Sequence, residues 1–114
     1  MNKLEFDLKQ IPLFRSLPEG EIDFLVRALQ PLSLDPGAVL FEEGDAGDTF
    51  YLIQQGEVDI IKSMGAGDEQ IIDHRQAGDF FGEMSLLIPD GRRTASVRAR
   101  SPVQLMALNR TDFE

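Results

Sequence analysis

The chain of 114 residues contains no cysteine, a single histidine and no long uncharged hydrophobic run. Without cysteine it cannot form disulfides, thiolate-ligated iron–sulfur clusters or cysteine-based zinc sites. One histidine cannot supply a metal site that needs two or three imidazoles. No apolar run approaches the roughly 20 residues that span a bilayer, and MNKLEFDLKQ at the start lacks a signal peptide's apolar core. These absences favour a cytoplasmic protein without membrane contact.

Basic residues are also scarce. The sequence has 11 lysines and arginines against 20 acidic residues, a formal net charge of -9. This balance argues against non-specific binding to nucleic acid. The hydrophobic residues, 42% of the chain, include eight phenylalanines and support a folded core. At this length we expect one domain, which buries roughly two-thirds of the surface of the unfolded chain.

Helical periodicity is confined to the N-terminal part. Residues 18–29 (PEGEIDFLVRAL) place Ile22, Leu25, Val26 and Leu29 at helical spacing, behind a proline and a glutamate suited to a first turn. Residues 4–10 resemble a shorter helix, which residues 11–14 (IPLF) interrupt. This pattern predicts two helices before the main body of the fold.

From about residue 32 the sequence changes to short β-prone segments with turn signals every eight to twelve residues. The turns carry glycine, as in GDAGD at 44–48 and QG at 55–56. The expected strands include residues 38–41, 50–54, 58–62, 69–75, 95–99 and 103–109. The spacing predicts a mainly β fold, an eight-stranded antiparallel β-roll or jelly roll with N-terminal helices.

Residues 80–97 (FFGEMSLLIPDGRRTASV) differ from the rest of this region. Gly82 precedes a short apolar run, 84–88, and a glycine before a helical turn lets backbone N–H groups approach an anion. Residues 83–100 hold four arginines against two acidic residues in an otherwise acidic chain. Arginine's planar guanidinium suits the oxygens of a phosphate. Glu83 fits beside a phosphate if it accepts a hydrogen bond from a sugar hydroxyl, which indicates a nucleotide.

The same residues resemble the phosphate-binding cassette of the cyclic nucleotide-binding domain family. In that cassette, Phe-Gly-Glu is followed by two variable residues, by Leu, and then by Arg-Ser/Thr/Ala-Ala leading into a strand. The stretches GDAGDTFYLIQQGEVDI and IPLFRSLPEGEIDFLVRAL are similar to the family's β-roll and N-terminal helices, so the resemblance covers nearly the whole chain. It implies a regulatory β-roll that binds cyclic AMP or cyclic GMP, with a short helix in the cassette.

The resemblance also implies roles for individual residues. Gly82 and Ser85 would give backbone N–H groups to the cyclic phosphate and ribose region, and Glu83 would accept the ribose 2′-hydroxyl. Arg93 would pair with the phosphate, and Thr94 would add a hydroxyl and an N–H group. With two neighbours, the predicted ligand-binding set is Gly82, Glu83, Met84, Ser85, Arg93, Thr94 and Ala95.

Two adjacent arginines are candidates for the phosphate contact. Arg92 and Arg93 follow Glu83 by nine and ten residues, and the family contains both spacings. The next residues, 94–97 (TASV), match those after the family's phosphate arginine if Arg93 takes that role. Arg93 is therefore predicted to bind the phosphate, and Arg92 is predicted to face solvent.

The sequence indicates the base of the nucleotide less specifically than its phosphate contact. A threonine at position 94 can favour cyclic GMP in the family through the exocyclic amine of guanine, yet serine or threonine also occurs there in cyclic AMP binders. We predict cyclic AMP and leave cyclic GMP open. Ile72 and Val97 are candidate base-pocket residues, and equally they are candidates for plain core positions.

The sequence gives little support for catalysis or for metal binding. His74 is predicted to lie on a strand surface, and Ser96 has no histidine placed to activate it as a nucleophile. We expect neither enzymatic activity nor a cofactor. The aspartates in turns are expected to cap backbone N–H groups rather than bind calcium: Asp45, Asp48, Asp68 and Asp79.

The expected organisation is a helical segment at 1–31, a β-roll at 32–110 with the cassette at 80–97, and the truncated start of a C-terminal helix at 111–114. In the family, helices after the last strand close over the base and carry the signal. We therefore expect either a fragment of a larger regulator or a domain whose lid comes from elsewhere. The expected partners are a cyclic nucleotide, an effector or C-terminal helices outside this chain, and a second copy in a homodimer, without direct nucleic-acid contact. The alternative is a degenerate β-roll that serves as a structural or dimerisation module.

Overall fold

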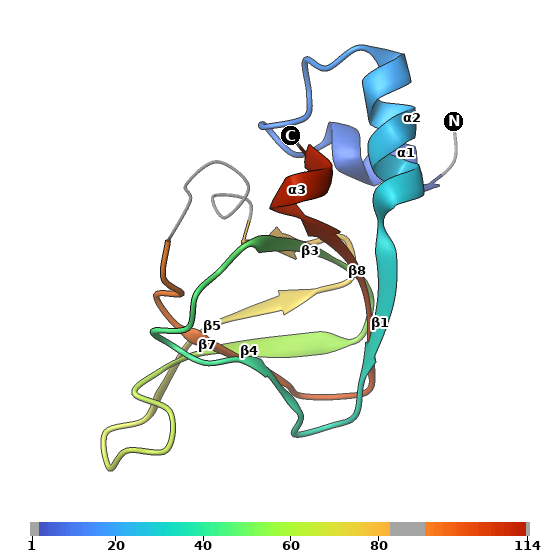
Figure 1. Cartoon of the computed structure of the whole chain (residues 1–114). Helices are drawn as coiled ribbons and strands as arrows, with labels where there is room; N and C mark the ends of the chain where they lie inside the picture. The colour runs from blue at the N-terminus through green and yellow to red at the C-terminus, as the bar shows by residue number, and fades with distance from the viewer. Residues whose placement is uncertain (1–2, 83–90, 114) are drawn as a thin grey trace.

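The computed structural model describes residues 3–82 and 91–113 (Figure 1). Within these ranges the helices are α1 (Lys3–Lys9), α2 (Glu19–Ala28) and α3 (Arg110–Phe113). The strands are β1 (Gln30–Leu34), β2 (Val39–Phe41), β3 (Thr49–Gln55), β4 (Glu57–Lys62), β5 (Gln70–Gln76), β6 (Phe80–Phe81), β7 (Ser96–Ala99) and β8 (Val103–Asn109). The short helix expected at 84–88 lies outside the described residues.

The strands form two four-stranded sheets with the orders β1-β8-β3-β6 and β2-β7-β4-β5. Every pair of neighbouring strands is antiparallel. Figure 1 shows the helices together at one end of the roll. The mainly β architecture with N-terminal helices that the sequence predicts is confirmed.

Helix α2 connects the helical end to the first strand. Pro18 caps its start with extended backbone (φ -59°, ψ 153°), and its buried residues Ile22 and Leu25 share one face. Leu29 is extended again and ends the helix directly before β1. Strand β1 accommodates Pro31 because it lies at the edge of its sheet. No helix in the described ranges combines the length and the hydrophobicity that a bilayer crossing requires.

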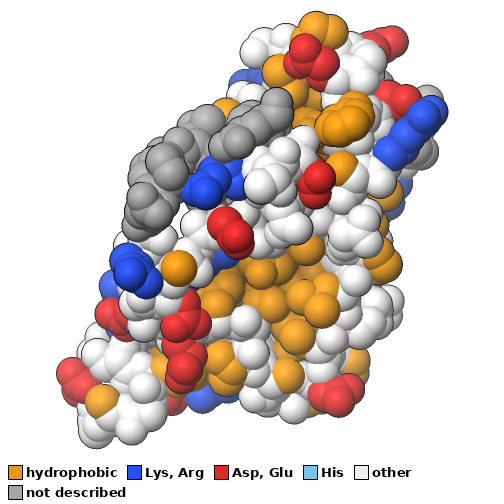
Figure 2. Space-filling view, in the orientation of Figure 1, with side chains coloured by type: hydrophobic (Ala, Val, Ile, Leu, Met, Phe, Trp, Pro, Cys, Tyr) orange, Lys and Arg blue, Asp and Glu red, His pale blue; other side chains and the backbone are white. Residues whose placement is uncertain are grey.

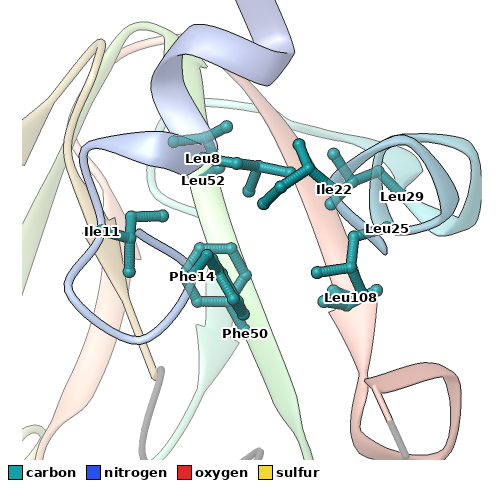
Figure 3. Packing of buried hydrophobic residues seen from close by; sticks show 9 residues of the cluster. All are labelled: Leu8, Ile11, Phe14, Ile22, Leu25, Leu29, Phe50, Leu52 and Leu108. Carbon is teal, nitrogen blue, oxygen red and sulfur yellow. The ribbon is translucent and has the colours of Figure 1, made fainter. Parts of the chain in front are cut away.

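The helices bury one face of the first sheet. Phe14, in the segment between α1 and α2, meets Phe50 of β3 edge to face, with ring centroids 5.5 Å apart (Figure 3). The cluster comprises Leu8, Ile11, Phe14, Ile22, Leu25, Leu29, Phe50, Leu52 and Leu108. The helical segment is therefore part of the same folded unit as the strands.

A second core contains residues from both sheets. It comprises Ile53, Val58, Val97, Ala99, Val103 and Leu105. Strand β3 contributes to both cores, because Phe50 and Leu52 belong to the helical cluster while Ile53 belongs to the second. Burial on both faces fixes the position of β3, whose first residues lie next to the site described below.

Candidate functional site

A cavity of about 650 Å³ lies among strands of both sheets and the residues that lead into β7. Its described lining combines aromatic rings with charged side chains. The lining residues are Phe41, Ile60, Arg75, Asp79, Phe80, Phe81, Gly82, Arg92, Arg93, Thr94, Ala95 and Val97. Three of them are arginines, so the wall of this cavity is more basic than the acidic chain as a whole.

The loop between β2 and β3 holds the residues that precede β7. The backbone N–H of Gly44 donates to the carbonyl of Arg93, and the N–H of Arg93 donates to the carbonyl of Asp45, both at 2.8 Å. The N–H of Gly47 donates to the carbonyl of Gly91 at 3.0 Å. These bonds join segments more than forty residues apart in the sequence. The backbone around Arg93 is therefore positioned by a distant loop as well as by its own neighbours.

Arg93 is only 9% exposed. Its Nη2 donates to the carbonyl of Thr49 at 2.8 Å, and its Cζ lies 4.2 Å from the centroid of the Phe41 ring. Burial is the largest contribution and lowers the pKa of Arg93, while electrostatic interactions with Tyr51 and with the carboxylates of Asp48 and Asp45 act in the opposite direction. Because an arginine keeps its charge in proteins, the structure holds a cation in the cavity wall.

Two glycines leave the space that this guanidinium occupies. A Cβ at Gly47 would lie 2.6 Å from Nε of Arg93, and a Cβ at Gly82 would lie 2.8 Å from its Nη1. Gly82 also has a φ of +80°, which residues with a side chain rarely adopt. The sequence singled out Gly82 for backbone approach to an anion, whereas Gly47 was interpreted as a turn glycine only.

The other predicted ligand residues have different surroundings. Thr94 is exposed, and its carbonyl accepts from Nζ of Lys62. Ala95 is buried, and both residues line the cavity. Arg92 also lines the cavity, but its side chain is exposed whereas that of Arg93 is buried. The predicted residues Glu83, Met84 and Ser85 lie outside the described residues.

The two candidate base-pocket residues separate in the structure. Val97 of β7 lines the cavity and also belongs to the core between the sheets, with 2% of its surface exposed. Ile72 of β5 is 51% exposed and does not belong to the described lining of the cavity. Val97 is thus the candidate whose position suits contact with a ligand in this cavity.

Several cavity residues were not identified from the sequence. Phe41 and Phe81 line it together with Arg75, whose guanidinium binds the carboxylate of Asp73. The hydrogen bond from Arg75 is the largest contribution that lowers the pKa of Asp73. Phe81 stands in the Phe-Gly-Glu motif, although it is not among the predicted ligand residues. Phe41 and Arg75 lie in ordinary strands, where an aromatic or basic residue gives no local signal that it lines a cavity, so these two positions required the three-dimensional structure.

Two of the four turn aspartates accept hydrogen bonds from backbone N–H groups, as expected, and His74 lies on a strand surface. Asp45 accepts from the N–H of Glu42 at 2.9 Å, and Asp79 accepts from the N–H of Gln76 at 2.8 Å. His74 lies on β5 with its side chain 53% exposed, and its Nδ1 is 2.7 Å from Oδ1 of Asp59. The described residues contain no group of three or more histidine, cysteine or acidic side chains suited to a metal ion.

Comparisons with known proteins show that this chain is similar to regulatory proteins. The chain is 37% identical to a cAMP-dependent protein kinase regulatory subunit of Colletotrichum orbiculare and 38% identical to that of Hypocrea atroviridis, each over 94% of this chain. It spans only 26% and 22% of the lengths of these two relatives.

Solved structures show the same fold. The regulatory domain of Toxoplasma gondii PKA with cAMP superposes with a TM-score of 0.87 at 34% identity, covering 96% of this chain and 41% of that one. A cyclic nucleotide-binding-like protein from Brucella abortus, at 24% identity and a TM-score of 0.89, covers 98% of this chain and 95% of that one. The family model for the cyclic nucleotide-binding domain matches residues 31–114. This chain belongs to the cyclic nucleotide-binding domain family.

Proposed function

We propose that this chain binds a cyclic nucleotide in the cavity beside Arg93, with the cyclic phosphate against the guanidinium. The observation that carries this proposal is the buried arginine in the cavity wall, at the position where the family's motif has its phosphate arginine. A monoanionic cyclic phosphate complements that charge, and each charge-assisted hydrogen bond contributes roughly 1.5–3 kcal/mol.

The remaining predicted residues complete the proposed site. Gly82 gives a backbone N–H to the phosphate region, and Glu83 accepts the ribose 2′-hydroxyl. Thr94 supplies a hydroxyl near the phosphate, and Val97 contacts the base. Met84, Ser85 and Ala95 belong to the same proposed ligand-binding set.

We favour cyclic AMP as the ligand. The relatives that match along most of this chain are regulatory subunits of cAMP-dependent kinases, and a structural neighbour at 34% identity was solved with cAMP. Because a threonine at position 94 can favour cyclic GMP in the family, cyclic GMP is the second nucleotide to test. Because the curated relatives are regulatory subunits, we assign the site a regulatory role rather than a catalytic one.

The biological role follows from the size of the chain relative to its relatives. Since it spans about a quarter of the curated regulatory subunits it matches, we propose that it passes a conformational signal to an effector domain or subunit outside these residues. A cytoplasmic setting and self-association into a homodimer are part of this proposal, and direct contact with nucleic acid is not.

Calorimetric titration of cyclic AMP and cyclic GMP tests the proposed site. Arg93→Ala should weaken binding about 30- to 1,000-fold, since losing the phosphate contact costs roughly 2–4 kcal/mol. Arg92→Ala is the matched control, because it removes the neighbouring exposed arginine, and it should change affinity much less. Linear 5′-AMP should bind more weakly than cyclic AMP if the site is shaped for the cyclic phosphate.

Two results would contradict the proposal. Absence of binding heat and of thermal stabilisation with either cyclic nucleotide at millimolar concentration would favour a β-roll that has lost its ligand. A larger loss for Arg92→Ala than for Arg93→Ala would show that the phosphate arginine is Arg92.

A further inference from the structure

The guanidinium of Arg93 lies over an aromatic ring. The distance from Cζ to the centroid of Phe41 is 4.2 Å, and the distance to the centroid of Tyr51 is 5.8 Å. Phe41 belongs to β2, Tyr51 to β3 and Phe81 to β6, and the three rings pack on one another with centroids 5.3–6.0 Å apart. The arginine is therefore held against an aromatic cluster assembled from both sheets.

The type of contact matters for an arginine that has to bind an anion. The face of an aromatic ring attracts a cation through its quadrupole and takes up no N–H donor. The guanidinium lies over the ring of Phe41, and its Nη2 donates separately to the carbonyl of Thr49. Phe41 can thus orient Arg93 without using the N–H groups that a phosphate requires.

We propose that Phe41 is a positioning residue for anion binding, whose ring holds the Arg93 guanidinium in the orientation that receives the cyclic phosphate. This inference rests on the proposed cyclic nucleotide site and adds the residue that prepares its arginine. The cation–π attraction at a largely desolvated site is the physical basis, and Phe41 is half-buried beside Arg93, a residue that is 9% exposed.

A series of ring substitutions at position 41 separates this electrostatic role from simple packing. Replacing Phe41 by mono-, di- and trifluorophenylalanine withdraws electron density from the ring face with little change in volume. We expect the affinity for cyclic AMP, measured by calorimetry, to fall at each step. Phe41→Leu, which removes the ring, should weaken binding roughly 5- to 30-fold, and Phe41→Tyr should retain most of the affinity.

The nuclear magnetic resonance signal of the Arg93 Nε–H group gives a second readout that needs no nucleotide. Stacking under Phe41 should shift this proton by ring current, and Phe41→Leu should abolish the shift while Phe41→Tyr preserves it. An unshifted proton in the wild type, or equal affinity across the fluorinated series, would overturn the positioning role and leave the nucleotide site intact. A wild type that binds neither cyclic nucleotide would instead overturn the proposed function and the positioning role with it.

Discussion

At the scale of single residues, Gly47 shows that the loop between β2 and β3 packs closely against Arg93, the residue proposed to bind the phosphate. A Cβ at this position would lie 2.6 Å from Nε and 2.9 Å from Cζ of Arg93, so Gly47→Ala has to displace the guanidinium. We expect roughly tenfold weaker binding of cyclic AMP in calorimetry, because a charge-assisted contact is misdirected rather than removed. The control is Gly67→Ala, since a Cβ at Gly67 meets nothing within 4 Å. Equal affinities for the two variants would contradict this account.

Tyr51 provides a spectroscopic test of the same surroundings because it is the only tyrosine in the chain. Burial raises its pKa, and the positive charge of Arg93 opposes this only partly. A raised pKa means that the folded state holds the phenolic proton more tightly than the unfolded state. The stabilisation is complete below about pH 10, the ordinary value, and is lost as the pH rises through the pKa of the folded state.

The ultraviolet absorbance of tyrosinate should therefore titrate at a higher pH in the native protein than in denaturant. Denaturation midpoints measured above about pH 10 should fall as the pH rises. Tyr51→Phe should remove the absorbance change. It should also remove the part of the stability loss at alkaline pH that comes from ionisation of the Tyr51 phenol. A native titration that coincides with that of the denatured chain would show that the phenol is not sequestered.

The residues that the sequence could identify are those in the local motif. Arg93 and Gly82 stand in an ordered pattern of residue types, and the residues that follow the two arginines favour Arg93 over Arg92 as the phosphate ligand. Phe41 is placed beside Arg93 by the pairing of β2 with β7, and Gly47 by the hydrogen bonds between the loop at 42–48 and the residues before β7. Contacts of this kind depend on which segments pair in space, and a single sequence contains no local sign of them.

At the scale of elements, the helical segment depends on Phe14 for its attachment to the sheet. Phe14 is fully buried and meets Phe50 edge to face. Phe14→Ala should lower the free energy of unfolding by about 3–5 kcal/mol, as measured by urea denaturation. Phe24→Ala on α2 is the matched control, since Phe24 is 59% exposed and should change stability little. Comparable losses for the two variants would mean that the helices are not anchored through this contact.

Most of the strands predicted from the sequence are those in which hydrophobic residues follow the pattern of burial of the strand. The expected strands at 50–54, 58–62 and 103–109 correspond to β3, β4 and β8, which bury alternate or continuous apolar positions. Strands β1 and β6 were not placed individually, because β1 is largely exposed and β6 contains only two residues. Strand β5 was found, but its position at a sheet edge leaves Ile72 exposed. Burial at an edge depends on neighbouring strands, which local periodicity does not reveal.

At the scale of the whole molecule, two electrostatic effects on an anionic ligand oppose each other. The chain carries a formal net charge of -9. On the face drawn in Figure 2, acidic side chains lie at several places around an apolar hollow. The cavity wall contains Arg75, Arg92 and Arg93. Net charge acts over the longer distance, whereas the arginines act only near the site. The Debye length, about 30 Å at 0.01 M salt and about 8 Å at 0.15 M, determines which of these the approaching nucleotide experiences.

The association rate constant of cyclic AMP should therefore rise as salt is added from about 0.01 M to about 0.15 M, because screening removes the long-range repulsion before it weakens the contact with Arg93. Stopped-flow measurements with a fluorescent cyclic AMP analogue test this. The neutral nucleoside adenosine, used as a competitor, is the control for effects of salt on the protein itself, since its association should not change in this way. A rate constant that falls steadily with salt would show that the arginines of the cavity outweigh the net charge even at a distance, so that the acidic surface does not hinder entry of the ligand.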